Sequence, residues 1–301
     1  MWFRNLVLYR TAGWKPKAAE LEEALARHTF QPCGKMDMES RGWLPPRGEG
    51  DALVHALGGQ MLIALGVEQK LLPASVINHY ARERAAEIEE QQGFRPGRKQ
   101  QREIREQVTD ELLPRAFERR RSTHAWIDTA GGWLAVDAAN LAKADELLEV
   151  LRKCVAPLPL ATLKTQLSPA SAMTGWLASG DPPAGFTIDR DCEFLAPGED
   201  KSTVRYVRHP LEAKDVRGHL EDGKQVTRLA LTWNDRISFV LNENLQVKRL
   251  AFLDILKEQA EKDAEGGDEL FDADFAIMSG ELSRFLPDLV EALGGEAAEA
   301  A

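Results

Sequence analysis

The chain has 301 residues, of which 44% are hydrophobic and 29% are charged. This length can bury the core of one large domain or two ordinary ones, and the composition is that of a folded protein rather than a disordered one. No run of about eighteen apolar residues occurs, and the first ten residues become polar too quickly for a secretion signal, so we expect a cytoplasmic protein with no membrane partner. The net charge of −10 argues at first against a nucleic-acid partner.

The negative charge is concentrated at the end of the chain. Residues 254–301 hold 14 acidic and 3 basic side chains, whereas the first 253 residues hold 34 acidic and 35 basic ones. Basic residues gather in two stretches, Arg95–Arg105 with a net charge of +4 and Arg115–Arg121 with a net charge of +3. Such segregation allows one face of the protein to bind a polyanion, although a solvated helix face is the commoner explanation of a basic run.

Hydrophobic periodicity predicts the elements of the first half in chain order. We expect a strand at 5–11, a helix at 16–28, a Gly- and Pro-rich loop at 30–58, and a short hairpin or strand at 60–72. Two charged helices with few large apolar residues, at 75–92 and 98–113, predict an arm that projects from the body.

The second half mixes strands and helices without a regular βαβ order. We expect a strand–turn–strand unit at 126–137, a helix capped by Asn140, a helix at 168–180, irregular structure at 182–203 with a strand near Phe186, a helix at 211–220, a three-stranded meander at 229–252, and helices at 254–263 and 280–293. This order favours an α+β fold with mixed or antiparallel sheets and packed helices.

These elements suggest four parts of the chain. We divide it into a first α+β part of the body at 1–74, the helical arm at 75–121, a central ββα part at 122–180, and a second α+β part with the acidic C-terminal region at 181–301.

Motifs for enzyme chemistry are missing from the sequence. It contains no glycine-rich phosphate loop and no G-x-S-x-G turn, its three cysteines are far apart, and its histidines lack metal-ligand spacing. Asp272 and Asp274 would share one face of a strand and could begin a metal site, but no further ligands lie nearby, so a solvated edge is the simpler interpretation. We therefore expect neither a cofactor, a metal nor a catalytic residue.

The segment Leu113–Phe117 stands out because an aromatic residue follows a helix-ending proline among arginines. An exposed phenylalanine in this setting suggests a self-association contact or a wedge that stacks on bases. The alternative is that Phe117 packs the arm back onto the body, and the pattern alone does not separate the two.

Several short motifs, in this order and spacing, resemble the bacterial recombination-associated protein RdgC family from end to end. They are MWFRNL at 1–6 with Tyr9-Arg10, FQPCG at 30–34, GWLPP at 42–46, LLPRAF at 112–117, WIDT at 126–129, FDADF at 271–275 and LGGE at 293–296.

The resemblance implies a nucleoid-associated protein of the cytoplasm that binds DNA without sequence preference. Its partners would be double-stranded DNA, possibly also single-stranded DNA, and a second copy of the chain. The family's ring-shaped homodimer takes duplex DNA through a positively charged hole and limits the access or activity of the RecA recombinase. No catalytic activity or cofactor belongs to the family.

The resemblance also suggests site residues. The family's gate-like dimer contact, which is linked to DNA binding, falls on Arg115 and Phe117, and its basic segment near the DNA channel falls on Arg205, Arg208 and His209. Here the sequence departs from relatives that carry a further lysine where Val207 stands and an amide where His209 stands, so Arg208 is the stronger candidate. With the basic stretches included, the predicted DNA-binding residues are Arg98, Lys99, Arg102, Arg115, Arg119, Arg120, Arg121, Arg205, Arg208 and His209.

These residues predict binding through neutralised phosphates, with a steep dependence on salt. The acidic C-terminal region is expected outside the ring, away from the phosphates. Two rival functions stay open at this point. One is a regulator that contacts RecA directly through the charged arm, and the other is a metal-dependent enzyme that uses Asp272 and Asp274.

Overall fold

The computed structural model describes residues 1–48, 50–198, 201–212, 214–262 and 266–297. Its strands form two antiparallel sheets with helices packed against them, which confirms the predicted α+β class. Within these residues neither sheet closes into a barrel, because each strand order has two ends.

The first sheet has seven strands in the order β2-β4-β5-β6-β1-β7, with β3 also paired to β4. The strands are β1 (Val7–Arg10), β2 (Glu39–Leu44), β3 (Val54–Leu57), β4 (Gln60–Leu71), β5 (Phe117–Asp128), β6 (Trp133–Val136) and β7 (Ala161–Thr162). The two longest, β4 and β5, pair along their whole length, from Gln60 opposite Asp128 to Leu71 opposite Phe117. Their far ends therefore carry the chain well beyond the rest of the sheet.

The second sheet has five strands in the order β12-β11-β10-β8-β9. They are β8 (Phe186–Leu195), β9 (Thr203–Tyr206), β10 (Gln225–Trp233), β11 (Ile237–Asn242) and β12 (Val247–Phe252). The predicted meander of β10, β11 and β12 is confirmed, because apolar residues such as Leu229 and Leu231 alternate with outward-facing ones as a half-buried sheet requires.

Both faces of the first sheet are buried. Val7 and Ile63 belong to the cluster shared with α1 (Ala18–Ala26) and α4 (Leu141–Cys154), whose N-cap is the predicted Asn140. Leu62, one residue from Ile63, belongs to the cluster on the opposite face, which includes α5 (Pro169–Ser179), α7 (Asp254–Lys262) and α8 (Gly267–Ala292). That second cluster also contains the apolar side of the second sheet, so one core joins the two sheets.

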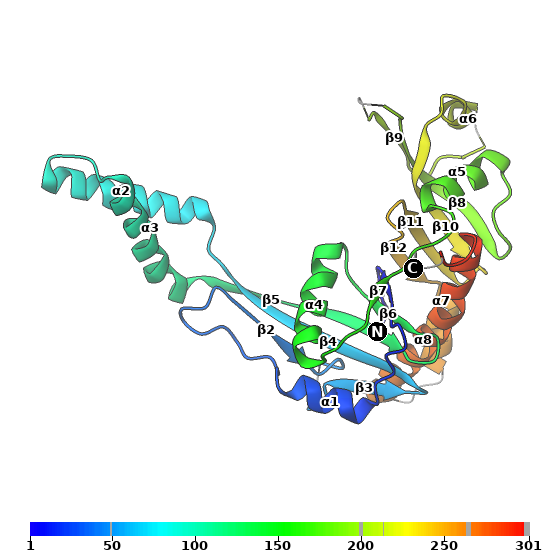
Figure 1. Cartoon of the computed structure of the whole chain (residues 1–301), viewed down its shortest axis with the longest axis horizontal. Helices are drawn as coiled ribbons and strands as arrows, with labels where there is room; N and C mark the ends of the chain where they lie inside the picture. Colours follow the sequence, from blue (N-terminus) through cyan, green and yellow to red (C-terminus); the bar gives the residue numbers. More distant parts are fainter. Residues whose placement is uncertain (49, 199–200, 213, 263–265, 298–301) are drawn as a thin grey trace.

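The predicted arm is confirmed by the helices α2 (Ala74–Gln92) and α3 (Arg98–Leu112). They pack on each other through a small core of Ala81, Ile104 and Val108, and they project from the far ends of β4 and β5 (Figure 1). A short 3-10 turn, η1 (Leu113–Arg115), leads from α3 into β5. Residues 117–121, which we group with the arm on sequence, are the first residues of β5.

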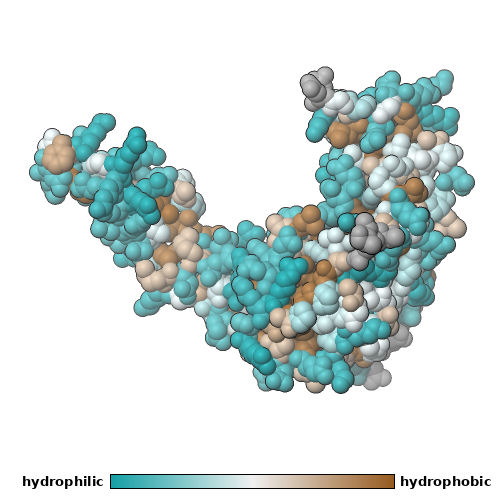
Figure 2. All heavy atoms as spheres, viewed as in Figure 1, coloured by the Kyte–Doolittle hydropathy of each residue, from teal (hydrophilic) through white to brown (hydrophobic). Residues whose placement is uncertain are grey.

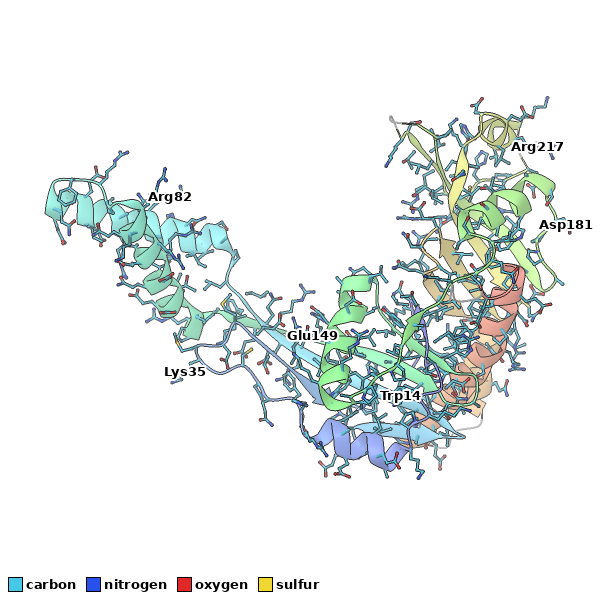
Figure 3. All side chains as sticks on the ribbon, viewed as in Figure 1. Trp14, Lys35, Arg82, Glu149, Asp181 and Arg217 are labelled. Atoms are coloured by element: carbon cyan, nitrogen blue, oxygen red, sulfur yellow. The ribbon has the colours of Figure 1, made fainter. Side chains whose placement is uncertain are left out.

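The chain as a whole is a crescent (Figure 1). The arm forms one end, and β9 with α6 (Lys214–Glu221) forms the other, while α4 stands at the floor between them. Figure 3 labels Arg82 and Arg217 at the two ends and Glu149 on α4. The space-filling view shows that the region between the ends is hollow (Figure 2).

Two expectations about secondary structure were wrong, and a third was right only in part. The stretch 30–58 contains β2 and β3. In 182–203 the strand expected near Phe186 is confirmed as β8, but it runs for ten residues and is followed by the start of β9, so less of this stretch is irregular than predicted. Glycine and proline hid β2, whose Gly42 lies so close to the Phe30 backbone that a side chain would clash. Asp272 and Asp274 lie in α8 rather than in a strand, because that helix begins earlier than its apolar pattern predicts.

Candidate nucleic-acid interface

The basic residues of α3 are exposed along the arm. Lys99 and Arg102 each pair with a glutamate one helical turn further on, at 3.9 Å to Glu103 and 2.9 Å to Glu106. Arg98 and Arg102 line a shallow pocket on the arm, between α3 and Ile77 of α2. The acidic partners offset much of the positive charge that the sequence shows in this stretch.

The three consecutive arginines of β5 are divided between the two faces of the first sheet, because side chains alternate along a strand. Arg120 binds the carboxylate of the buried Glu68, with nitrogen–oxygen distances of 2.8 and 3.0 Å, and stacks over the ring of Phe30. Arg121 pairs at 2.6 Å with Glu146 of α4. Arg119 is exposed beside them. Within the described residues, Arg119 is therefore the member of the triplet without an ion pair.

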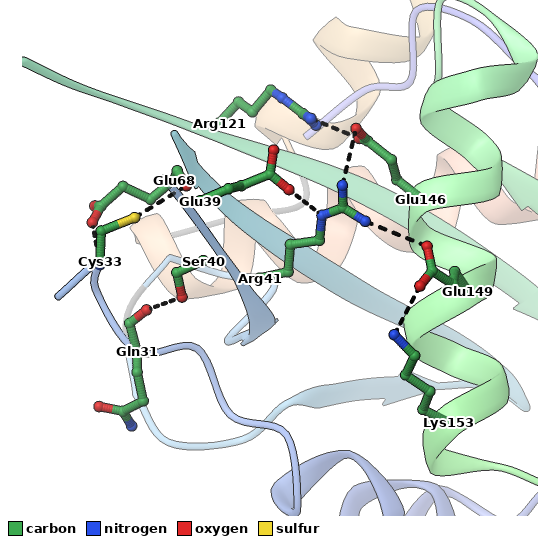
Figure 4. A network of polar contacts seen from close by, with 10 residues as sticks. All are labelled: Gln31, Cys33, Glu39, Ser40, Arg41, Glu68, Arg121, Glu146, Glu149 and Lys153. Carbon is green, nitrogen blue, oxygen red and sulfur yellow. Dashed lines mark hydrogen bonds and ion pairs between the residues drawn. The ribbon is translucent and has the colours of Figure 1, made fainter. Parts of the chain in front are cut away.

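Arg121 belongs to a polar network between the first sheet and α4 (Figure 4). Glu146 also lies 3.9 Å from Arg41 of β2, and Arg41 reaches Glu149 at 3.4 Å. Lys153 completes the chain by pairing with Glu149 at 2.8 Å. Arg121 therefore holds α4 on the sheet, and this contact leaves its guanidinium only partly exposed.

The buried carboxylate of Glu68 is the acceptor that holds Arg120. Its carboxylate accepts the backbone N–H of Cys33 at 2.7 Å as well as the Arg120 guanidinium. These two hydrogen bonds, the Cys33 one first, lower the pKa of the Glu68 carboxyl. Arg120 therefore has a structural role as the counter-ion of a buried carboxylate.

Phe117 and Arg115 lie where the arm joins the sheet. Arg115 ends η1 and is exposed, and the side chain of Phe117, the first residue of β5, is 84% exposed. Its cross-strand partner Leu71 is also exposed, so the two form an apolar spot at the root of the arm. The alternative that Phe117 packs the arm onto the body is not what the structure shows.

The predicted basic segment at the other end of the crescent includes and follows β9. Arg205 is exposed and lies opposite Glu193 of β8. Arg208 has a φ of 53° and donates its backbone N–H to Asp191 at 2.8 Å. The His209 ring packs against Tyr206 in a tilted arrangement, with 4.8 Å between ring centroids.

The structure adds three cations that we did not predict. Arg228 of β10 and Lys248 and Arg249 of β12 lie with Arg205 on the polar face of the second sheet, around one pocket. Figure 1 shows β11 and β12 on the inner side of the crescent, with α5 on its outer side. Lys248 also donates to the Ala139 carbonyl before α4, at 2.5 Å, so this face looks toward the floor of the hollow. The alternation in the meander could have revealed Arg228 and Lys248.

The proposed metal pair does not exist as such. Successive side chains in a helix point in different directions, and Asp272 is bound by Arg47 and lies 3.4 Å from His55, whereas Asp274 binds the N-terminal amine. Burial first, and the positive charge of Arg47 second, lower the pKa of His55. Across the part of the chain that the structure describes, no three His, Cys, Asp or Glu residues are grouped to hold a metal ion.

None of the described helices is both long and apolar enough to cross a membrane.

Comparison with known proteins places this geometry in a family. A family model described as "Putative exonuclease, RdgC" matches residues 1–296. A recombination-associated protein RdgC of Dechloromonas aromatica is 59% identical over all of both chains. Relatives of the same name from Cupriavidus pinatubonensis and Bordetella pertussis are 56% and 52% identical, each over 98% of this chain and 99% of their own. The chain therefore belongs to the RdgC family of recombination-associated proteins.

Proposed function

We propose that the protein binds double-stranded DNA through its phosphates, without sequence preference, in the hollow of the crescent. The observation that carries this proposal is the cluster of Arg205, Arg228, Lys248 and Arg249 on the polar face of the second sheet, on the inner side of the crescent. Guanidinium and ammonium groups on an open sheet face suit a polyanion, and contacts to phosphates carry no sequence information.

The distribution of acidic groups supports the same orientation. Much of the charge of the acidic C-terminal region lies on α7 and α8, and α8 packs on the apolar side of the second sheet, opposite its polar face. A duplex in the hollow would thus be separated from α8 by the sheet. The net charge of −10 then excludes a uniformly basic binder but not a basic inner surface.

We further propose that two crescents close into a ring around the duplex. A crescent leaves its hollow open on one side, and a second copy that met both ends would close it. Phe117 and Leu71 supply an apolar contact at the root of the arm. Burying these exposed apolar side chains against a second copy would be favourable.

Antagonism of RecA would follow from such a ring. A protein that encloses DNA occupies the phosphates that a recombinase filament needs, so direct contact with RecA is not required. The same retention on DNA would place the protein on the nucleoid.

Duplex binding at several salt concentrations tests the proposed function. We expect 30-base-pair duplexes of unrelated sequence to bind with the same Kd within about twofold, and log Kd to change linearly with log salt at a slope of about 0.9 per neutralised phosphate. A flat salt response, or strong preference for one sequence, would contradict the proposal. The same duplexes, end-labelled and incubated with Mg²⁺ or Mn²⁺, test the exonuclease activity that the family description names, and we expect their length to stay unchanged.

A further inference from the structure

The pocket on the polar face of the second sheet has a volume of about 180 Å³ and an unusual set of charges. Four of its lining residues are cationic and two are acidic; these are Arg205, Arg228, Lys248, Arg249, Asp191 and Glu193. These charged residues come from four of the five strands, and the fifth strand, β11, contributes Val240 and Asn242 to the pocket. The sheet register therefore assembles an excess of positive charge from residues that are up to 58 positions apart.

A β-bulge in β12 places two consecutive cations at this pocket. Ser238 of β11 lies opposite Ala251 and Val240 lies opposite Lys248, so Arg249 and Leu250 together face a single residue, Phe239. In a regular strand Lys248 and Arg249 would point to opposite faces, but a bulge re-aims a side chain, and both line the pocket.

The bulge is strained at Arg249, whose φ of 50° lies in the left-handed region that disfavours side chains. A side chain in this region is disfavoured relative to glycine, which fits the position without strain. Observed strain of this kind at a surface residue points to a functional reason for keeping the side chain.

One carboxylate holds this strained arginine and a second one in place. Asp191 accepts from the Arg249 guanidinium at 3.1 Å through Oδ2 and from the Arg208 backbone at 2.8 Å through Oδ1. Arg208 is itself left-handed, with a φ of 53°. Asp191 thus fixes the local backbone and partly neutralises Arg249.

Among the described residues that line the pocket, four cations face two carboxylates. Arg228 reaches Glu193 at 3.5 Å, and Glu193 lies opposite Arg205 in the sheet register, so this carboxylate is the neighbour of both arginines on the sheet. Burial, followed by the positive charge of Arg228, lowers the pKa of Lys248. An anion bound between Arg228, Lys248 and Arg249 would relieve this repulsion and match the planar donors of the two arginines.

We propose that this pocket is a seat for one backbone phosphate of the bound nucleic acid, held by Arg228, Lys248 and Arg249, with Asp191 as the counter-ion that the phosphate displaces from Arg249. This inference rests on the proposed function, and it deepens it by naming where the duplex is gripped. The seat fixes the position of the DNA relative to the second sheet rather than merely attracting it.

The decisive variant is Arg249→Gly, because glycine relieves the strain while it removes the charge. We expect its thermal midpoint to equal or exceed that of the wild type, its Kd for a 30-base-pair duplex to rise about fivefold at low salt, and its salt slope to fall by about one. Asp191→Asn keeps an acceptor for the Arg208 N–H but removes the negative charge, so its Kd should fall about twofold to threefold. Arg27→Gln removes one positive charge from the end of α1 and should bind as the wild type does.

The outcomes separate this inference from the proposed function. If the wild type fails to bind duplexes, the proposed function itself is wrong. If the wild type binds and Arg249→Gly and Asp191→Asn bind equally well, only the phosphate seat is overturned. Inorganic phosphate should compete no better than other salts of the same ionic strength. Saturable competition at micromolar phosphate that Arg249→Gly abolishes would instead assign the pocket to a small phosphate ligand.

Discussion

The two basic regions of this molecule differ in what their cations do. In the arm and at the start of β5, the basic residues are consecutive or one helical turn apart, and Lys99, Arg102, Arg120 and Arg121 each have a carboxylate partner. On the second sheet, cations from distant parts of the sequence surround one pocket and outnumber its carboxylates. A basic run in the sequence is therefore a poor guide to a basic surface, because register and pairing decide where the net charge appears.

The largest expected effect is a loss of folding stability in acid, caused by a buried histidine of the first sheet. His124 lies in β5, and its burial lowers the pKa from its ordinary value of 6.5 to about 4, against an opposing hydrogen bond to the Pro46 backbone. The folded state thus favours the neutral ring, so this stabilisation is complete above pH 6.5 and is lost as the pH falls toward 4. The total loss is about 3 kcal/mol, of which about 2 kcal/mol is expected by pH 5.

Urea unfolding at pH 7 and pH 5 measures this loss. His124→Gln has no proton to gain and should show a much smaller difference between the two pH values than the wild type does. His28→Gln, at an exposed position, is the matched control and should retain the wild-type difference. Equal pH dependence in the wild type and His124→Gln would show that His124 is not the group responsible.

The second largest effect is expected at Arg120, which tests whether the arginines of β5 are structural. Arg120→Ala leaves the buried Glu68 carboxylate with the Cys33 N–H but without its cation. We expect a loss of about 2 kcal/mol in the free energy of unfolding, less than for a fully buried pair because half of the Arg120 side chain is exposed. Duplex affinity of the folded variant should change less than twofold. A large loss of affinity with full stability would return Arg120 to the DNA interface.

The contrast between the regions also explains which parts of the fold were predictable. The meander β10–β12 and the helix after Asn140 follow from regular apolar spacing, since each element buries one face. The start of β8 near Phe186 was predicted but its ten-residue length was not, because two register shifts against β10 and the acidic residues Asp189, Asp191 and Glu193 interrupt its alternation. The beginning of β5 was not predicted, because its first four residues are exposed and show no apolar alternation.

The candidate site was predictable only where the charge is local. Arg205 and Arg208 were named through family resemblance, and Arg119–Arg121 through their clustering, but alternation then sends Arg120 and Arg121 to different carboxylates. Arg228 and Arg249 are 21 positions apart in the numbering and meet only through strand pairing and a bulge. Composition and spacing carry no sign of such a bulge, because its left-handed residue is an arginine rather than a glycine.

Phe117 should report on self-association rather than on DNA contact or folding. With 84% of its side chain exposed, Phe117→Ala should change the free energy of unfolding by less than about 0.5 kcal/mol. If two copies meet at this spot, sedimentation equilibrium should show a dimer Kd raised about tenfold. Ile255→Ala on α7 removes another exposed apolar side chain and should leave association unchanged. Unchanged association of Phe117→Ala would remove this residue from the dimer contact.

The finest test of the comparison pairs one arginine from each region. Arg102 and Arg228 are both exposed and both face a glutamate, at 2.9 and 3.5 Å, so replacing either by glutamine removes the same charge from a similar ion pair. We expect Arg228→Gln to raise the duplex Kd about fivefold and to reduce the salt slope by about one, because Arg228 would contact a phosphate in the proposed seat. Arg102→Gln should change the Kd less than twofold, because Glu106 offsets its charge within the arm. Equal effects would mean that the duplex responds to the summed charge of the crescent, and the second sheet would then have no special part in binding.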